Sequence, residues 1–295
     1  SIVGNSLMRL QKLKGYQGPR GAVVLVIMDG VGIGDGGPGD MVEKASTPHL
    51  DWLAANTPHT RLRAHGLAVG MPSDDDMGNS EVGHNAIGCG RVFSQGASLV
   101  QDAVSSGSLY QGEIWGKLVE NCVKNQSAFH FIGLLSDGNV HSHIAHLESM
   151  LSTVLEAGVS RARVHVLLDG RDVPPTSALD YVDRLEAFLA SLREGSENAD
   201  FAIASGGGRL NITMDRYHAD WGMVERGWDV HVRGSGAAFE SAREAIESHR
   251  ADNPGVIDQD LPPFVITRDG RPIGPICDGD SVVLFNFRGD RAIEI

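Results

Sequence analysis

Cysteine and long hydrophobic runs are scarce in this sequence, and their scarcity excludes several classes of protein. Three cysteines occur in 295 residues, and the spacing of Cys89, Cys122 and Cys277 forms neither a disulfide framework nor a C-x-x-C metal site. Such usage is typical of a reducing compartment, and we expect the protein to be cytoplasmic. The longest early apolar run, Ala22 to Met28, is as long as a strand and far short of the ~20 residues that span a bilayer.

Positive charge is also in deficit, which constrains the partners of the protein. The chain has 25 lysines and arginines against 38 acidic residues, and its formal net charge is −13. A chain of this charge is a poor generic binder of nucleic acid or of anionic membranes. We therefore expect a small-molecule partner. An anionic substrate would have to be attracted locally, by placed arginines or by metal ions.

The two ends of the chain differ from its middle. Residues 1–20 contain four basic residues and no acidic residue, so they are either the remnant of a targeting segment or a loosely ordered arm. At the other end, the sequence stops at Ile295, a few residues beyond a charged loop. Compact domains seldom end in this way, and we expect the chain to be a fragment of a longer protein.

Strand-like and helix-like segments alternate along the chain, which predicts an α/β fold with a parallel sheet. Residues 21–28 read as a buried strand, and Thr47 reads as the cap of a helix that begins at Pro48. Residues 66–91 read as loop with a short helix start. After residue 95 we expect strands at 129–135, 163–168, 201–204 and 281–287, and helices at 144–155, 179–192 and 237–248.

An acidic residue and a serine are the first candidates for chemistry. Asp29 directly follows the apolar run, and a carboxylate at a buried strand end is costly unless it is paired or bound to a metal. Ser80 lies in the segment 78–82, which lacks the G-x-S-x-G pattern of a hydrolase elbow. If Ser80 begins a helix, the helix N-terminus would stabilise a phosphate on its oxygen, and divalent cations would suit both side chains. The alternative is that Asn79 or Ser80 only caps a helix.

Polar, glycine-containing loops follow four of the predicted strands. Because the carboxyl ends of parallel strands meet at one edge of a sheet, we expect the side chains of these loops to lie close together. Three glycines at 206–208 would let backbone N–H groups approach an anion, although no P-loop sequence follows them. An anionic ligand best explains clustered arginines in an acidic protein; the alternative is that they are scattered over the surface. The five arginines of these loops are Arg171, Arg209, Arg216, Arg288 and Arg291.

Two of these loops contain further candidates. His141 is a possible phosphate ligand or general acid–base; alternatively, it starts a helix after an ordinary turn. Arg171 could bind a carboxylate in bidentate fashion while Asp172 binds a hydroxyl. The alternative for this pair is a surface turn of little energetic value.

Taken in order, these motifs resemble those of one family, the bisphosphoglycerate-independent phosphoglycerate mutases. The resemblance extends over most of the chain, and its motifs are long and specific. They are Val26-Ile27-Met28-Asp29-Gly30, Ala64-His65-Gly66, Gly78 to Asn85, Ser136-Asp137-Gly138, Val140-His141-Ser142, Asp169 to Val173, Ala204 to Arg209, Met214 to Tyr217 and Asn286 to Arg291.

The resemblance implies an alkaline-phosphatase-like domain that is interrupted by a second α/β domain. Residues 1–94 would be the N-terminal part of the phosphatase-like domain, and residues 95–295 would belong to the inserted transferase domain. The implied reaction interconverts 3-phosphoglycerate and 2-phosphoglycerate in glycolysis and gluconeogenesis. It would need no bisphosphoglycerate, and the family resemblance favours a monomer.

The resemblance also implies roles for individual residues. Ser80 would carry the phosphoryl group as a phosphoserine. Asp29 and Ser80 would ligate one of two divalent ions, manganese or, in some members, magnesium or cobalt. Closure of the two domains on the substrate would exclude water that could hydrolyse the phosphoserine. The substrate would be bound by His141, Arg171, Asp172, Arg209, Arg216, Arg288 and Arg291.

One departure from the family pattern leaves other functions open. The family needs further aspartate and histidine ligands and a substrate lysine, which we do not find in the sequence up to Ile295. A chain that truly ends there is expected to be inactive. The competing activity is that of a metal-dependent phosphatase of the same superfamily, which would hydrolyse the phosphoserine. The arginine-rich insertion argues against it, because a phosphatase need not hold its dephosphorylated product. A non-catalytic binding module is the third possibility.

Overall fold

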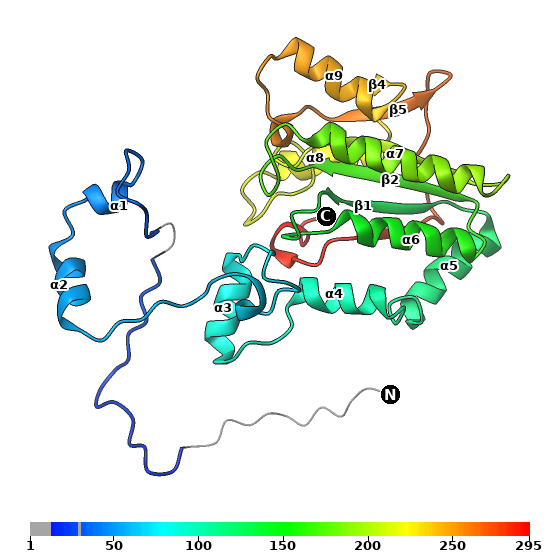
Figure 1. Cartoon of the computed structure of the whole chain (residues 1–295). Coiled ribbons are helices and arrows are strands. Elements are labelled where there is room, and N and C mark those ends of the chain that lie inside the picture. The colour runs from blue at the N-terminus through cyan, green and yellow to red at the C-terminus, as the bar shows by residue number, and fades with distance from the viewer. Residues whose placement is uncertain (1–12, 29–30) are drawn as a thin grey trace. The chain divides into compact units, whose positions relative to one another are not determined.

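The computed structural model describes residues 13–28 and 31–295, and the chain divides into two compact units (Figure 1). The first unit comprises Ser1–Arg61 and the second comprises Leu62–Ile295. The domain boundary predicted between residues 94 and 95 lies within the second unit and stays a prediction. No helix in the described part of the chain is long and apolar enough to cross a membrane.

Two short helices, α1 (Met41–Lys44) and α2 (Pro48–Asn56), lie in the described part of the first unit. Thr47 is the N-cap residue of α2 and Pro48 is its first residue, as the sequence predicts. The Thr47 hydroxyl donates to the Asp51 carboxylate at 2.9 Å. Neither helix contains a buried residue, so local interactions rather than core packing account for them.

The predicted buried strand at residues 21–28 is wrong for this structure. These residues form neither helix nor strand, and their apolar side chains are exposed, Val24 to 80%. A strand is held by hydrogen bonds to a neighbouring strand, and no described segment pairs with this one. Asp29, the predicted metal ligand at the end of this strand, lies outside the described residues.

The second unit is built on a mixed sheet, in which the described residues supply seven strands. Their order is β4-β5-β3-β2-β1-β7, and β6 pairs with β5. β1 is parallel to both β2 and β7, and β2 is parallel to β3, which confirms the predicted parallel architecture at the centre. β5 runs antiparallel to β3. The strands are β1 (Phe129–Leu135), β2 (Arg161–Leu168), β3 (Asp200–Gly208), β4 (Ala237–Phe239), β5 (Phe264–Arg268), β6 (Arg271–Pro272) and β7 (Ser281–Leu284).

The long predicted helices are confirmed as α6 (Ile144–Glu156) and α7 (Ala178–Glu194). The predicted helix at 237–248 is wrong at its start, because residues 237–239 pair with β5 as strand β4. The helix in this region begins only after the N-cap residue Ser241. The remaining helices are η1 (Gly66–Val69), α3 (Ser80–Cys89), α4 (Gly96–Ser105), α5 (Glu113–Asn125), α8 (Trp221–His231), α9 (Ala242–Asp252), η2 (Asp258–Asp260) and η3 (Gly289–Arg291).

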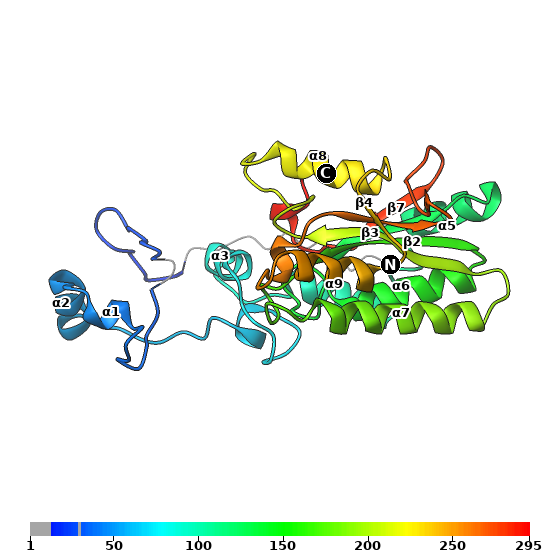
Figure 2. The ribbon, with the colours of Figure 1, turned by 90° about the horizontal axis from the view of Figure 1, so that it is seen from above.

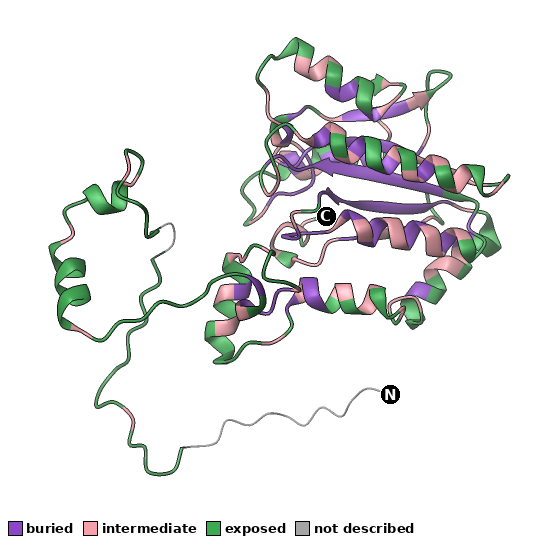
Figure 3. Cartoon of the chain, in the orientation of Figure 1, coloured by how far each residue is buried: buried purple, intermediate pink, exposed green. Residues whose placement is uncertain are grey.

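The two faces of the sheet are covered differently. Helices α6, α7 and α9 lie on one face and α8 lies on the other (Figure 2). The first face buries a large apolar core, and β1 and β2 are buried along most of their length (Figure 3). This core includes Phe129, Phe131, Leu147, Leu151, Val164, Val182, Leu185 and Phe201. The α8 face has a smaller apolar cluster, formed by Leu134, Leu167, Ile212, Met214, Val230 and Val265.

Three buried histidines lie on the α8 face, where apolar residues are few. His130, His165 and His231 are at most 1% exposed. Burial lowers the pKa of His231 to about 3 and holds the pKa of His165 well below its ordinary value. Burial also lowers the pKa of His130, against the opposing effect of the Asp280 carboxylate. All three imidazoles are therefore neutral at neutral pH.

We predict that mild acid destabilises the second unit. In the unfolded chain the three histidines take up protons below about pH 6.5, whereas in the folded protein they do so only at lower pH. Stability is therefore full above that pH and falls as the pH decreases toward the folded-state pKa values. Each histidine that stays neutral in the folded protein over that range contributes about 1.4 kcal/mol per pH unit, as expected for His165 and His231.

Urea unfolding at pH 7.5 and at pH 5.5 measures this effect. The free energy of unfolding should be clearly lower at pH 5.5, and the variant His231→Asn should show a weaker dependence on pH. Equal unfolding midpoints at the two pH values in the wild-type protein would contradict the prediction.

Candidate functional site

One buried carboxylate joins the polar loops at the carboxyl edge of the sheet. Asp169, immediately after β2, is 2% exposed. Its Oδ2 accepts a hydrogen bond from the Ser136 hydroxyl at 2.6 Å, and its Oδ1 accepts one from Arg209 Nη1 at 2.7 Å. Ser136 directly follows β1 and Arg209 directly follows β3. Asp169 therefore fixes the loops after three neighbouring strands relative to one another.

Arg209 extends this contact to two predicted substrate ligands. Its Nη1 lies 2.6 Å from Asp172 Oδ2, and its Nη2 lies 2.9 Å from His141 Nε2. The arginine is 2% exposed, and a buried guanidinium is costly unless carboxylates compensate its charge. Asp169 and Asp172 supply that compensation. The structure thus brings His141, Asp172 and Arg209 together, as the sequence predicts.

The turn at 169–172 is not the weak surface turn that the sequence leaves open. The backbone N–H groups of Arg171 and Asp172 donate to Asp169 Oδ1 at 3.2 and 3.1 Å. Gly170 has a φ of +65°, which favours glycine, and a Cβ there would lie 2.9 Å from the Pro175 carbonyl oxygen. The Asp172 side chain is 12% exposed, whereas Arg171 is exposed. The turn is therefore a specific structure that buries Asp172 beside Arg209.

His141 is neutral in this environment. Burial, together with the nearby arginines, lowers its pKa to about 2. Because an arginine N–H only donates, His141 Nε2 accepts from Arg209, and the ring proton lies on Nδ1. Nδ1 is buried and has no hydrogen-bond partner among the described residues. These features favour the interpretation of His141 as a hydrogen-bond donor to a ligand over that of an imidazolium acid.

Three further arginines gather around the same edge. Arg216 Nη1 and Arg288 Nε lie 3.3 and 3.0 Å from the two carboxylate oxygens of Asp290. Arg291 Nη1 donates to the carbonyl oxygen of Met214 at 2.8 Å. The alternative of arginines scattered over the surface is therefore wrong for these residues.

The arginines repel one another electrostatically. The pKa of Arg291 is lowered by burial and then by the positive charges of Arg216 and Arg209. Arg209, Arg288, Arg291 and Arg216 also contribute, after burial, to the low pKa of His141. An anion bound among these groups would relieve their repulsion, so the cluster is suited to a phosphate or a carboxylate.

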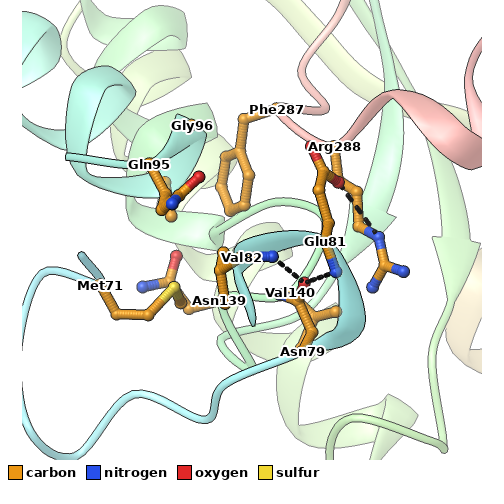
Figure 4. Close-up of a pocket in the computed structure, with 11 residues that line it drawn as sticks. Met71, Asn79, Glu81, Val82, Gln95, Gly96, Asn139, Val140, Phe287 and Arg288 are labelled. Atoms are coloured by element: carbon orange, nitrogen blue, oxygen red, sulfur yellow. Dashed lines mark hydrogen bonds and ion pairs between the residues drawn. The ribbon is translucent and has the colours of Figure 1, made fainter. Parts of the chain in front are cut away.

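Ser80 is the first residue of helix α3, which is the condition that the sequence analysis set for stabilising a phosphate on its oxygen, and it is exposed. Asn79 is the N-cap residue, because its Oδ1 accepts from the N–H groups of Glu81 and Val82 at 3.0 and 3.2 Å (Figure 4). The capping alternative is thus confirmed for Asn79. Ser80 remains a hydroxyl at the positive end of a helix, where an attached phosphate would be stabilised.

Helix α3 is linked to the arginine cluster. Glu81 Oε2 lies 3.4 Å from Arg288 Nε (Figure 4). The loop before α3 is in turn linked to the loop after β1, because Asn139 Nδ2 donates to Asp76 Oδ1 at 2.5 Å. Asn139 has a φ of +54°, a conformation that asparagine tolerates better than most residues. A small pocket lies at this junction and is lined by Met71, Asn79, Glu81, Val82, Gln95, Gly96, Ala97, Asn139, Val140, Phe287 and Arg288.

The described residues do not form a metal centre on their own. Among residues 13–28 and 31–295, no group of three or more histidine, cysteine, aspartate or glutamate side chains is placed to hold a metal ion. Asp29 lies outside these residues, and Ser80 alone is not a metal site. The metal-binding roles of Asp29 and Ser80 therefore stay predictions.

Sequence reasoning missed the residues that hold the loops of the site in place. Asp169 and Asp290 each lie within two residues of a predicted arginine, and this adjacency was a usable signal. Ser136 and Asp76 gave no such signal, since their partners lie 33 and 63 residues away in sequence.

Comparisons with known proteins identify the family of the chain. The family model described as the BPG-independent PGAM N-terminus matches residues 100–295. The chain belongs to this mutase family. It is 56% identical over 275 residues to a probable 2,3-bisphosphoglycerate-independent phosphoglycerate mutase of Leptospira interrogans, and 53% identical over 279 residues to the Trypanosoma brucei mutase.

The alignments cover most of this chain and half of each relative. The Leptospira match spans 92% of this chain and 50% of the relative, and the Trypanosoma match spans 94% and 50%. A crystal structure of Leishmania mexicana phosphoglycerate mutase at low cobalt concentration matches with a TM-score of 0.86 and 52% identity, over 91% of this chain and 49% of that one. The chain thus spans about half the length of the mutase relatives that it matches.

We predict that Asp169→Asn strongly destabilises the second unit. The substitution keeps the shape of the side chain but leaves the buried Arg209 with Asp172 as its charged partner. Removal of one partner from a buried ion pair costs about 3–5 kcal/mol. Urea unfolding at pH 7.5 measures the change.

The matched control is Asp183→Asn, which removes the partner of Arg243 in an ion pair between side chains that are 49% and 46% exposed. This exposed pair should contribute less than about 1 kcal/mol. Equal effects of the two substitutions would show that Asp169 has no special role.

Proposed function

We propose that this chain is part of an enzyme that interconverts 3-phosphoglycerate and 2-phosphoglycerate without bisphosphoglycerate. The observation that carries the proposal is the arginine cluster around neutral His141, in a chain of the mutase family. The cluster offers several guanidinium groups to one small anion, as a substrate with both a phosphate and a carboxylate requires. The chain spans half of its mutase relatives, so the activity belongs to the whole protein.

Ser80 is the proposed nucleophile. Its Oγ forms a bond to phosphorus while the bond from phosphorus to one glycerate oxygen breaks, and the serine proton ends on that oxygen. The retained glycerate then presents its other hydroxyl, whose oxygen takes the phosphoryl group from Ser80 while its proton returns to the serine. No water is consumed, so the net reaction is an isomerisation.

The second unit supplies the groups that hold the glycerate between these steps. Arg209 is fixed by Asp169 and Asp172, so it is preorganised for an anion. The Nδ1–H of His141 is a buried donor that a phosphate or carboxylate oxygen can accept from. Asp172 is proposed to bind a substrate hydroxyl. The remaining proposed substrate ligands are Arg171, Arg216, Arg288 and Arg291.

Two divalent ions complete the proposed mechanism, with Mn²⁺ preferred and Mg²⁺ or Co²⁺ as alternatives. Asp29 and Ser80 are proposed ligands of one ion. When bound, such ions neutralise the oxygens of the transferring phosphoryl group. We further propose that residues 1–94 belong to an alkaline-phosphatase-like domain and residues 95–295 to an inserted transferase domain. The whole enzyme is proposed to be a cytoplasmic monomer.

A metal-dependent phosphatase of the same superfamily is the second candidate. It would share the phosphoserine and differ in its second step, in which water rather than glycerate takes the phosphoryl group. The clustered arginines disfavour it, since they would retain a product that a phosphatase releases. Free phosphate as the main product would favour the phosphatase.

We predict that Ser80→Ala in the whole enzyme abolishes isomerisation. Loss of a covalent nucleophile lowers turnover by a factor on the order of 10⁴ or more. Formation of 2-phosphoglycerate from 3-phosphoglycerate with Mn²⁺ measures the rate, and a phosphate assay on the same samples separates mutase from phosphatase. The control Ser108→Ala alters an exposed serine next to α4 and should keep full activity. Undiminished turnover by Ser80→Ala would overturn the proposed nucleophile.

We also predict that Arg291→Gln weakens phosphoglycerate binding. Loss of a charge-assisted hydrogen bond costs about 1.5–3 kcal/mol, which corresponds to about 10–150-fold in Kd. Calorimetric titration of the whole enzyme with 3-phosphoglycerate measures the affinity. The control Arg233→Gln removes an arginine that is 60% exposed and pairs with Asp229. Its Kd should stay within about twofold of the wild type, and an unchanged Kd for Arg291→Gln would argue against Arg291 as a ligand.

A further inference from the structure

A continuous chain of buried hydrogen bonds crosses the α8 face of the sheet. It runs from Asp280, before β7, through β1, β2 and β3 to α8 and the loop before it. The links are Asp280 Oδ2 to His130 Nε2 at 3.1 Å, His130 Nδ1 to His165 Nε2 at 2.9 Å, His165 Nδ1 to Ser205 Oγ at 2.7 Å, Ser205 Oγ to His231 Nδ1 at 2.8 Å, and His231 Nε2 to Thr213 Oγ1 at 3.0 Å.

The sheet is adapted to this chain. The register between β2 and β3 shifts after the pair Val164–Ile203, so that His165 lies opposite Ser205 rather than Ala204. Bulges of this kind redirect a side chain at a defined position. Buried polar groups are costly unless they are hydrogen-bonded. The register shift places the Ser205 hydroxyl within hydrogen-bonding distance of the buried His165 ring.

The donors and acceptors of the chain fit one direction when every imidazole is neutral. Asp280 is the acceptor at one end, so His130 Nε2 donates to it and His130 Nδ1 accepts from His165. Each following group then accepts from the next, and the last donor is the Thr213 hydroxyl. No ring nitrogen or hydroxyl of the chain is left without a partner.

Thr213 has a backbone conformation that needs support. Its φ is +68°, which is unusual for a β-branched residue and costs free energy. Its N–H donates to the Met223 carbonyl oxygen at 2.9 Å. Helix α8 approaches Thr213 so closely at Gly227 that a Cβ there would overlap the Thr213 hydroxyl oxygen. Contacts from α8 to the backbone and to the side chain of Thr213 therefore hold the strained residue.

The segment that follows Thr213 carries two parts of the arginine cluster. Met214, the next residue, accepts the hydrogen bond from Arg291 Nη1 through its carbonyl oxygen. Arg216 follows two residues later and pairs with Asp290. The backbone conformation of Thr213 thus determines the direction of the Met214 carbonyl and the position of the Arg216 backbone.

We propose that Thr213 and His231 are positioning residues for Arg216 and Arg291. The buried chain holds Thr213 in its left-handed conformation, and this conformation places the Met214 carbonyl and the Arg216 backbone for substrate binding. The proposal rests on the function proposed above, since it concerns arginines that are proposed to bind phosphoglycerate. Thr213 and His231 would not touch the substrate and would act through the loop that holds Met214 and Arg216.

The decisive comparison is between Thr213→Val and Thr213→Ser in the whole enzyme. Valine keeps the β-branched shape and loses the hydroxyl, whereas serine keeps the hydroxyl. We expect the KM for 3-phosphoglycerate to rise tenfold or more in Thr213→Val and to stay within threefold of the wild type in Thr213→Ser. The control Thr153→Val removes a half-buried hydroxyl that donates to the Ser149 carbonyl oxygen on α6 and should leave KM unchanged.

Hydrogen–deuterium exchange over residues 212–218 gives a second readout that does not depend on activity. Exchange should accelerate in Thr213→Val and not in Thr213→Ser. If the wild-type enzyme does not isomerise phosphoglycerate, the proposed function fails, and exchange alone decides the positioning role. An unchanged KM in an active Thr213→Val enzyme, or unchanged exchange in that variant, overturns the inference. Equal defects in both variants also overturn it, because they would not depend on the hydroxyl.

Discussion

The carboxylate of Asp169 accepts hydrogen bonds from Ser136 and Arg209, and at 2% exposure it would be strongly unfavourable without them. The reverse also holds, because the buried Arg209 needs Asp169 and Asp172. This mutual requirement locks the loops after β1, β2 and β3 into one arrangement. His141 takes its ring orientation from Arg209, so its free donor position follows from the same ion pair. The arrangement of this edge therefore depends on an ion pair that is complete before any ligand binds.

Much of the second unit could be predicted from the sequence, because several of its helices and strands have strong local sequence patterns. β1 and the helices α6 and α7 have long apolar patterns with the correct period, and the structure has them within two residues of the expected ends. The edge that carries Arg209 and Arg216 was predictable because parallel strands bring their carboxyl ends together. The family motifs named the same residues, and the chain belongs to that family.

What could not be predicted depends on contacts between distant segments. Residues 21–28 have the composition of a buried strand, but a strand requires a neighbour, and apolar composition does not supply one. Residues 237–239 read as helix because Ala237 and Ala238 favour helix, and pairing with β5 decided the outcome. The link between Asn139 and Asp76 spans 63 residues and joins two loops without any periodic signal. The roles of Ser80 and Asp29 stay predictions for a different reason, since they concern ions and a reaction rather than a fold.

The difference between the two faces of the sheet has a consequence for how the protein can change in evolution. The apolar core beneath α6, α7 and α9 can exchange one aliphatic side chain for another of similar volume at modest cost. The hydrogen-bonded network beneath α8 cannot, because each member between its two ends both donates to one neighbour and accepts from another. Replacing a single residue of this network leaves two neighbouring polar groups without a hydrogen-bond partner, whereas replacing several of its residues together could be neutral. We therefore expect the histidines and hydroxyls of this face to covary among relatives as one set, while the residues of the opposite face drift independently.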